Sequence, residues 1–310
     1  MKVCSFIPAV TQMIYDMGLE SDLYGVTFEC PDQALKEKQK VVRCVLEGKN
    51  YSSQEIDRIF SSSKAEGRSL YYVDENVLAD IMPDVIFTQD VCEVCQIDTA
   101  CTVAAVAKLP KEVKLVTISP DSLEDVFNSV VTIAKVFDKE EAAYQHLKGL
   151  QNRIDEIVDT QRANRLKPRR VSLLEWIEPI YNCGHWIPDQ IAYAGGIDML
   201  SNPSGDSIVT PWEKIVRYDP EVLVIAPCGF TTDRTLEEIK ILTSMKEWKS
   251  LKAVQNQEVY IADFDLFTQP SASTLVDGIE LLASCFNPSI FKLDKHLHHA
   301  VKSLKELQLV

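Results

Sequence analysis

Pro220-Glu221-Val222-Leu223-Val224 repeats the pattern of Pro83-Asp84-Val85-Ile86-Phe87, and a cysteine follows each stretch within a few residues. Each stretch is a short, mostly β-branched apolar run, which is typical of a buried strand. A second matching pair, Ile14–Gly18 and Ile191–Gly195, lies upstream of the first. More residues separate Ile14–Gly18 from the strand motif in the first half than separate Ile191–Gly195 from the strand motif in the second half. We therefore expect a duplicated unit whose first copy is enlarged within Pro31–Tyr72.

Further short apolar runs predict strands, and helical periodicity fills much of the chain between them. The runs are Lys2–Ile7, Val85–Thr88, Lys114–Ile118, Arg170–Leu174, Val222–Ala226 and Glu258–Ala262. Short buried strands that alternate with helices indicate α/β architecture. We expect two Rossmann-like lobes, each with a mainly parallel central sheet.

The segment between the two halves, Ser122–Leu166, contains no proline and a single glycine. Apolar residues recur there every three or four positions, which predicts one apolar helix face. Over Lys139–Leu166 such a helix would be about 40 Å long at ~1.5 Å per residue. We expect this backbone helix to connect the lobes stiffly. The predicted division is residues 1–121, an N-terminal lobe, 122–166, the helical segment, and 167–310, a C-terminal lobe.

The composition excludes several classes of protein. Hydrophobic residues make up 46% and charged residues 25% of the 310 residues, as in soluble globular proteins. A net charge of −14 argues against nucleic acid as a partner and against anionic membrane surfaces. The sequence has neither a recognisable signal peptide nor a long apolar span, so we expect no membrane insertion and a cytoplasmic location. Nine cysteines at irregular spacing favour reduced thiols over a disulfide framework.

The most distinctive connection in the chain is Glu175–Pro188. It holds two tryptophans, two carboxylates, two prolines and one histidine directly after a predicted strand. Loops at sheet edges carry function more often than the strands do. Wide aromatic faces beside a single imidazole suit a large, flat, partly apolar ligand.

In a two-lobed α/β protein the ligand lies beyond the carboxyl ends of the strands, so the loops after the predicted strands supply the candidate residues. Tryptophan faces would form walls, although they could equally pack the interface between the lobes. His185 could coordinate a metal or bond a polar ligand edge, or could be structural. The candidate ligand contacts are Pro8, Glu29, Cys30, Trp176, Glu178, His185, Trp186, Trp212, Phe230 and Phe264.

The Cys92-Glu93-Val94-Cys95 motif points to a different chemistry. Two thiolates at this spacing fit a soft metal, an iron–sulfur cluster or redox chemistry. A closed metal site would need further ligands, which Cys30, Cys101, Cys228 or His185 could supply, with Cys228 and His185 as the first candidates. Free thiols also serve as small apolar fillers. No catalytic triad, zinc-peptidase motif or phosphate loop is present, so we expect a binding protein more than an enzyme.

Most of the chain resembles a known family. The matching stretches are Ser5–Thr11, Gly25–Pro31, Glu66–Tyr71, Thr88–Cys95, Glu175–Gly196, Pro211–Glu213, Ala226–Phe230 and Leu275–Gly278. The chain resembles the substrate-binding proteins of ABC importers for cobalamin and ferric siderophores, and is most similar to a signal-less branch labelled cobalamin-binding protein. This resemblance implies the class III periplasmic-binding-protein fold, with the ligand in a cleft between the lobes.

The chain departs from the family pattern in two places. Phe28 stands where the family usually has histidine, and Gln269–Ser273 lacks both arginines of a characteristic turn. Without a recognisable signal peptide, a permease partner does not follow from the resemblance. The leading hypothesis is a binding protein for a corrinoid, cobalamin or cobinamide, or a similar metal chelate. The alternatives are a metal or redox protein that uses Cys92 and Cys95, and an enzyme descended from a binding protein.

Overall fold

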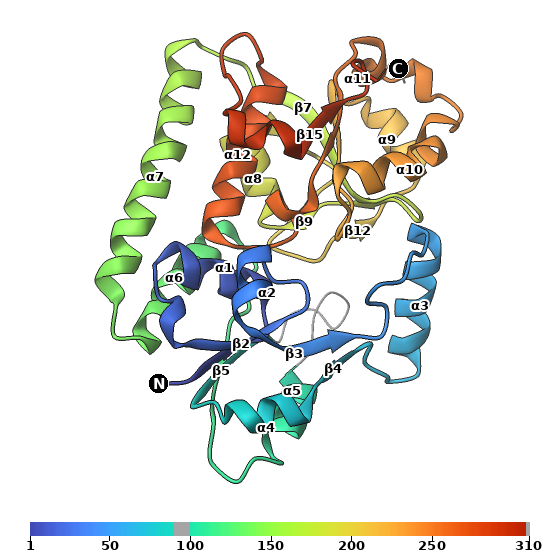
Figure 1. The fold of residues 1–310 in the computed structure, drawn as a ribbon. Helices are drawn as coiled ribbons and strands as arrows, with labels where there is room; N and C mark the ends of the chain where they lie inside the picture. The colour runs from blue at the N-terminus through green and yellow to red at the C-terminus, as the bar shows by residue number, and fades with distance from the viewer. Residues whose placement is uncertain (90–98, 308–310) are drawn as a thin grey trace. The chain divides into compact units, whose positions relative to one another are not determined.

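The computed structural model describes residues 1–89 and 99–307 of the chain (Figure 1). These residues form two compact units. The N-terminal unit comprises Met1–Tyr51, Glu55–Pro120 and Phe127–His146, and the C-terminal unit comprises Ser52–Gln54, Asp121–Val126 and Leu147–Val310. The boundaries expected for a separate helical segment, 122–166, stay a prediction.

The N-terminal unit is built on a six-stranded sheet. All its neighbouring strands run parallel except the last pair, β3 and β4. In spatial order the strands are β4 (Tyr71–Val73), β3 (Gln39–Cys44), β2 (Leu23–Thr27), β1 (Val3–Ser5), β5 (Val85–Thr88) and β6 (Lys114–Thr117).

The C-terminal unit contains a seven-stranded mixed sheet. Its main path is β12 (Ile208–Val209), β8 (Tyr181–Asn182), β7 (Arg169–Trp176), β13 (Val222–Ile225), β14 (Val259–Ala262) and β15 (Val301–Ser303). β10 (Gly196–Ile197) also pairs with β7. The central strands β10, β7, β13 and β14 are parallel, whereas β8, β12 and β15 are antiparallel to their neighbours. A separate small ladder joins β9 (Gly184–His185) to β11 (Asn202–Pro203).

The two sheets share a parallel centre with the same connectivity. The order β2-β1-β5-β6 in one unit corresponds to β10-β7-β13-β14 in the other. The Pro-acidic repeats of the sequence lead into β5 and β13, and the upstream matches end the helices α1 (Pro8–Asp16) and α8 (Ile187–Tyr193). Each of these helices is followed by a glycine with positive φ, Gly18 at 67° and Gly195 at 90°. The predicted duplication is therefore present in the topology, and its enlargement contains β3 and β4.

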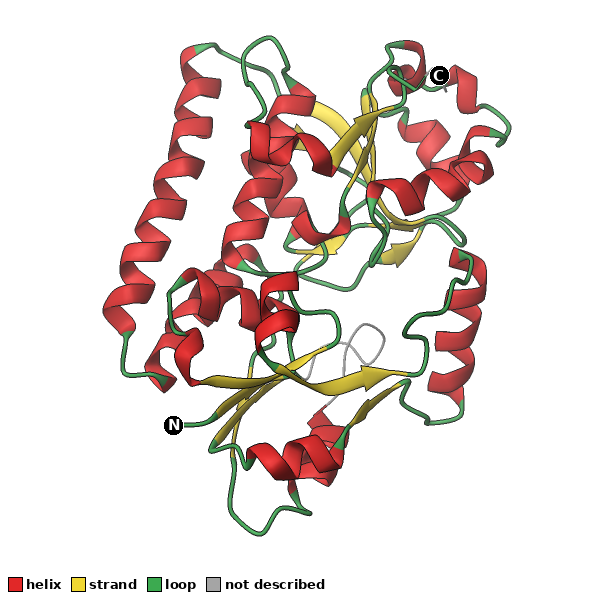
Figure 2. Cartoon of the chain, in the orientation of Figure 1, coloured by secondary structure: helices red, strands yellow, loops and turns green. Residues whose placement is uncertain are grey.

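Helices lie on both faces of each sheet (Figure 2). The remaining α-helices are α2 (Asp32–Glu37), α3 (Ser53–Ala65), α4 (Glu75–Ile81), α5 (Thr99–Val106), α6 (Leu123–Val136), α7 (Glu140–Ala163), α9 (Trp212–Tyr218), α10 (Thr232–Thr243), α11 (Lys252–Gln255) and α12 (Ala272–Phe286). Short 3₁₀ turns are η1 (Glu20–Asp22), η2 (Trp248–Ser250), η3 (Phe264–Leu266) and η4 (Lys295–Ala300). Within the described ranges, no helix combines the length and apolar character that a membrane crossing requires.

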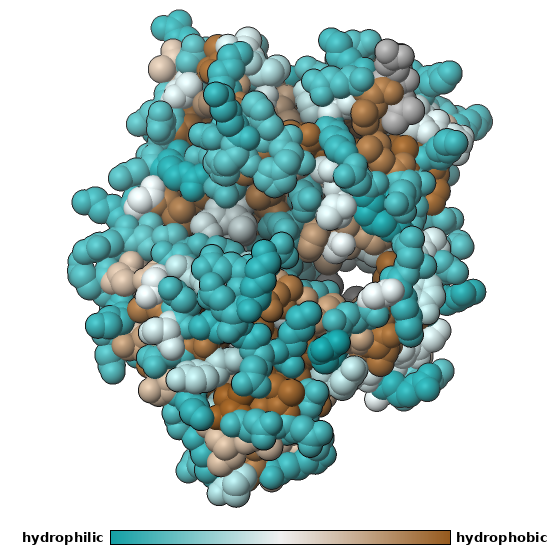
Figure 3. Space-filling model, viewed as in Figure 1, coloured by the Kyte–Doolittle hydropathy of each residue, from teal (hydrophilic) through white to brown (hydrophobic). Residues whose placement is uncertain are grey.

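The predicted long helix is α7, and it ends three residues earlier than expected. Its 24 residues run from Glu140 to Ala163, and Arg165 adopts a left-handed φ of 52°. A left-handed residue stops helix propagation before Pro168 does. Hydrophilic side chains cover most of the face drawn in Figure 3, while each unit encloses its own apolar core around the strands.

Candidate functional site

Three neighbouring strands of the C-terminal unit end at one edge of its sheet. β7, β13 and β14 are parallel and adjacent, so their carboxyl ends lie side by side. Trp176 is the last residue of β7, Phe230 follows β13, and Phe264 begins η3 directly after β14. The sequence predicted each of these aromatic residues as a ligand contact, and the sheet order brings them to the same edge.

These three residues, which we call the aromatic edge, are also linked by direct contacts. The ring centroids of Trp176 and Phe230 are 5.1 Å apart, with the planes tilted by 50°. The backbone N–H of Phe264 donates to the carbonyl oxygen of Phe230 at 3.3 Å. Cys228 lies half-buried next to them, and its N–H donates to the carbonyl of Glu175 at 2.9 Å. The edge is therefore one connected group of side chains and backbone.

The indole N–H of Trp176 has no hydrogen-bond acceptor among the described residues, although its Nε1 atom is buried. A buried donor without a partner is costly, and buried indole N–H groups usually find an acceptor. The aromatic edge consequently offers one unsatisfied donor beside two apolar rings.

Sequence reasoning missed Arg234, which supports the aromatic edge from α10. Its guanidinium carbon lies 4.3 Å from the centroid of the Phe230 ring, within the range of a cation–π contact. Arg234 also bonds Glu238 and lies 3.3 Å from a carboxylate oxygen of Glu237. Its positive charge is therefore matched within the unit. The spacing of four residues between Arg234 and Glu238 is the signal that predicts such a helical pair.

Glu238 is a buried carboxylate, 8% exposed, that joins this cluster to the start of α3. Its oxygens accept the backbone N–H of Ser53 at 3.0 and 3.1 Å and the Ser53 hydroxyl at 2.5 Å. The next residue, Gln54, donates its side-chain N–H to Glu178 at 3.3 Å. Ser52–Gln54 belong to the C-terminal unit, so the candidate Glu178 is held by residues of its own unit.

The Gly184-His185 pair lies in a tight backbone crossing. A Cβ atom on Gly184 would lie 2.3 Å from the carbonyl oxygen of Gly205, which requires glycine at this position. The N–H of Gly184 donates to a carboxylate oxygen of Glu175 at 3.1 Å, and the hydroxyl of Ser207 bonds the same oxygen. Glu175 therefore fixes the loop to the end of β7 and has a structural role.

His185 is strained and largely buried. Its φ of 51° lies in the left-handed region, which is uncommon for residues other than glycine. Its Nε2 lies 3.8 Å from Asp206 Oδ1, and its buried Nδ1 has no partner among the described residues. Burial lowers the pKa of His185, which outweighs the opposing effect of Asp206. A neutral imidazole is the form that binds metals or donates to a polar ligand, and either role stays a prediction.

Two of the predicted aromatic walls have structural partners instead. The indole N–H of Trp186 donates to the carbonyl of Phe267 at 2.6 Å, and its ring stacks on His185 at 5.3 Å. The indole N–H of Trp212 donates to the carbonyl of Lys246 at 2.7 Å, and its ring stacks on Trp248 at 6.2 Å. Both N–H groups are satisfied inside the unit, which differs from Trp176. Ligand contact by either ring stays a prediction.

The candidates of the N-terminal unit follow β1 and β2. Pro8 is the buried first residue of α1, and Glu29 is exposed in the loop after β2. Cys30 is 4% exposed, and its Sγ lies 3.2 Å from the hydroxyl oxygen of Thr11. Burial raises the pKa of Cys30 to about 11, so the thiol is protonated at neutral pH and is a poor ligand. Contact of these three residues with a ligand stays a prediction.

The predicted metal site cannot be placed as a whole, because Cys92 and Cys95 lie outside the described residues. Residues 1–89 and 99–307 contain no group of three or more His, Cys, Asp or Glu side chains that could hold a metal ion. Cys228 and His185 therefore do not complete such a group on their own. The seven cysteines within these ranges are free thiols. A soft metal or iron–sulfur cluster at Cys92 and Cys95 stays a prediction.

Comparison with known proteins places the fold and the family. A heme-binding periplasmic protein from Pseudomonas aeruginosa has a TM-score of 0.70 at 17% identity, covering 96% of both chains. The vitamin B12-binding protein BtuF of Vibrio cholerae has a TM-score of 0.60 at 17% identity, covering 93% of this chain and 97% of that chain. These likenesses confirm the class III periplasmic-binding-protein fold.

Sequence comparison agrees with the structural likeness. YvrC of Bacillus subtilis (strain 168), an ABC transporter substrate-binding lipoprotein, is 23% identical over 310 residues, covering 94% of this chain and 81% of that protein. The periplasmic binding protein family model matches residues 72–266, more than half of the chain. The resemblance seen in the sequence is thereby confirmed, and the chain belongs to the periplasmic binding protein family.

Proposed function

We propose that this protein is the substrate-binding component of an ABC transporter for a large metal chelate of the vitamin B12, heme or ferric siderophore type. A corrinoid, cobalamin or cobinamide, is the first candidate. Family membership and the names of the similar proteins support the transporter role and the class of ligand. The choice of a corrinoid rests on the chemistry of the aromatic edge.

The observation that carries the proposal is the meeting of Trp176, Phe230 and Phe264 at one sheet edge. Flat apolar rings bind a planar macrocycle over a large area with little loss of side-chain entropy. The unsatisfied indole N–H of Trp176 would donate to a polar group on the rim of such a ligand. This combination suits a macrocycle that carries hydrogen-bond acceptors at its periphery.

Charge at this edge favours a ligand with a neutral rim. Arg234, the cation that contacts Phe230, is already bonded to Glu238 and lies close to Glu237. The turn Gln269–Ser273 has no arginine. Heme carries two carboxylates that need cationic partners, whereas corrinoids carry several amides that accept hydrogen bonds without charge. We therefore rank corrinoids above heme.

The location of the protein forms a separate part of the proposal. The seven described cysteines are free thiols, and such usage suits a reducing compartment. We therefore keep a cytoplasmic location as a separate hypothesis, in which the protein binds the same class of ligand without serving a transporter. Cell fractionation with an antibody against the protein tests it, and recovery of the protein with the membrane or the cell envelope would refute it.

The ligand is tested by absorbance titration of the purified protein with cobinamide, cobalamin, hemin and a ferric hydroxamate siderophore. We expect cobinamide or cobalamin to show shifted corrinoid bands that saturate at one ligand per protein. Saturation by hemin or the siderophore alone would keep the transporter class and refute the corrinoid. No spectral change with any of the four, at tens of micromolar protein, would refute the proposed function.

A further inference from the structure

A cavity of about 230 Å³ lies next to η3 in the C-terminal unit. Three carboxylates and two imidazoles line it, together with apolar side chains. The titratable residues are Asp263, Asp265, Asp277, His296 and His299, and the apolar ones are Leu266, Leu297 and Ala300. They come from η3 and its N-cap residue Asp263, from α12 and from η4. The proposed function does not use this cavity.

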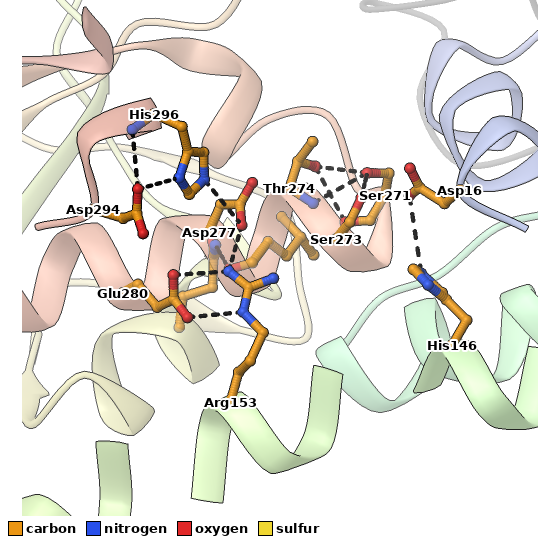
Figure 4. A network of polar contacts seen from close by, with 12 residues as sticks. Asp16, His146, Arg153, Ser271, Ser273, Thr274, Asp277, Glu280, Asp294 and His296 are labelled. Atoms are coloured by element: carbon orange, nitrogen blue, oxygen red, sulfur yellow. Dashed lines mark hydrogen bonds and ion pairs between the residues drawn. The ribbon is translucent and has the colours of Figure 1, made fainter. Parts of the chain in front are cut away.

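One of the three cavity carboxylates, Asp277, has a cationic partner. Arg153 of α7 donates to Asp277 Oδ1 at 2.5 Å and to the two oxygens of Glu280 at 2.8 and 2.7 Å (Figure 4). His296 lies between two carboxylates, with its Nδ1 2.9 Å from Asp294 Oδ1 and its Nε2 4.0 Å from Asp277 Oδ1. Arg153 therefore offsets part of the negative charge on this side.

The other two carboxylates are not matched in this way. Asp263 caps η3, since its Oδ1 accepts the N–H of Asp265 at 3.3 Å. Within the described ranges, no Lys, Arg or His forms a salt bridge with either of them, although an electrostatic effect of His299 opposes the rise in the pKa of Asp263. Asp265 stays partly exposed to solvent, and its partial desolvation together with the neighbouring Asp263 raises its pKa to about 6. Burial likewise raises the pKa of Asp263 and of Asp277.

The η3 turn connects these carboxylates to the aromatic edge. The N–H of Asp263 donates to the carbonyl of Ala300 at 2.8 Å, and the next residue, Phe264, donates to Phe230. On the opposite flank, Gln190 donates to the carbonyl of Leu266 at 2.9 Å. A displacement of η3 would therefore move Phe264 relative to Phe230.

We propose that the cavity is a proton-sensitive support for the aromatic edge. Its unmatched carboxylates repel one another when unprotonated, which loosens η3 and Phe264, and acidification removes the repulsion. Protons taken up by the carboxylates reduce the net negative charge of the cavity. The consequence for a ligand rests on the proposed function: affinity falls as pH rises.

Proton binding in the folded and unfolded states determines whether stability rises or falls with pH. A carboxyl group whose folded-state pKa is raised takes up a proton more readily in the folded protein than in the unfolded chain. Stability that depends on this proton is therefore present at low pH and is lost as pH rises through about 6. One pKa unit corresponds to a tenfold change in an equilibrium constant. Since Asp265 is exposed at the cavity rim, solvent screens the effect. Two full pKa units would change the opening equilibrium of η3 about hundredfold, and with this screening we expect a change of about tenfold.

Hydrogen–deuterium exchange of the ligand-free protein tests the proposal directly. We expect the peptide that spans Asp263–Phe267 to be about tenfold better protected at about pH 4.5 than at about pH 7.5, after correction for intrinsic exchange. The variant Asp265→Asn should show the high protection at both pH values. Asp159→Asn is the matched control, since Asp159 is 74% exposed on α7, and it should behave as wild type.

Two results would overturn the proposal. One is wild-type protection that does not change with pH, and the other is an Asp265→Asn variant that keeps the wild-type change. Should Asp265→Asn fail to fold, Asp263→Asn removes the other carboxylate while keeping a capping oxygen, and the same outcomes apply. Because no ligand is present, failure of cobinamide to bind would refute the proposed function without affecting this result.

Discussion

At the scale of single residues, the indole N–H groups separate the tryptophans by role. Trp186 and Trp212 donate to backbone carbonyls of their own unit. Trp176 has a buried Nε1 without an acceptor in the described part of the chain. Since a buried donor is normally bonded, the unsatisfied one marks the residue that gains most from a ligand.

Replacing Trp176 with phenylalanine keeps an aromatic face and removes the donor. If the indole N–H bonds the ligand, affinity for cobinamide should fall by about tenfold, the value of one hydrogen bond, with little change in stability. Titration by absorbance measures the affinity, and thermal unfolding measures the stability.

Trp212→Phe is the matched control for this substitution. It removes an N–H that is bonded to the carbonyl of Lys246, so it should lower stability and leave cobinamide affinity unchanged. Equal affinities for wild type and Trp176→Phe would mean that the indole N–H of Trp176 does not meet the ligand.

Arg234 provides a second prediction at this scale. Replacement by methionine leaves Glu238, a buried carboxylate, without its cationic partner. We expect the free energy of unfolding to fall by about 3 kcal/mol in urea denaturation, because the loss of one partner leaves the other charge buried and unpaired. Glu237→Gln, at a side chain 60% exposed, should change it by less than about 0.5 kcal/mol. Similar losses in both variants would contradict a special role for the buried pair.

At the scale of elements, the crossing of the Gly184-His185 segment with the 205–207 loop has no room for a side chain. Gly184→Ala places a Cβ atom against the backbone of Gly205 and Ser207. We expect a loss of about 1–3 kcal/mol in the free energy of unfolding. In contrast, Gly149→Ala in α7 meets open space and should gain about 0.5–1 kcal/mol from better helix propensity. Opposite signs in urea unfolding are the expected result, and a tolerated alanine at 184 would refute the steric account.

Arg153 holds α7 against α12 through Asp277 and Glu280. Since the Arg153 side chain is 33% exposed, its pairs are worth more than surface pairs and less than fully buried ones. Arg153→Met should lower the free energy of unfolding by about 1–2 kcal/mol. Arg162→Met, at a side chain 76% exposed on the same helix, should have an effect below about 0.5 kcal/mol. Equal effects would mean that the network contributes no more than a surface pair.

The sequence predicted long or strongly apolar elements well and short ones poorly. The buried cores of β5, β7, β13 and β14 and the presence of the long helix α7 follow from β-branched runs and helical periodicity. The two-residue strands β8 to β12 were not predictable, because two residues carry no periodicity. Their pairing depends on tertiary packing, such as the Gly184 crossing. The end of α7 was misplaced because a left-handed Arg165 has no residue-type signal.

At the scale of the whole molecule, the duplicated topology accounts for the position of the site candidates. Residues that follow parallel strands must share an edge, so Trp176, Phe230 and Phe264 could be grouped from the sequence. The sequence does not predict which side chains form contacts within the protein and are therefore not available to a ligand. The Trp186 indole donates to a backbone carbonyl, and the Cys30 thiol is buried. The role of Arg234 follows only from the position of its guanidinium over the Phe230 ring.

The central claim is that the aromatic edge binds a corrinoid. Calorimetric titration with cobinamide, of the wild type and of the double variant Trp176→Ala/Phe230→Ala, tests it most directly. We predict one-to-one binding to the wild type and a loss of more than about hundredfold in the variant, because two aromatic faces are removed. Unchanged heat and affinity in a folded double variant, or the absence of heat with the wild type, would contradict it.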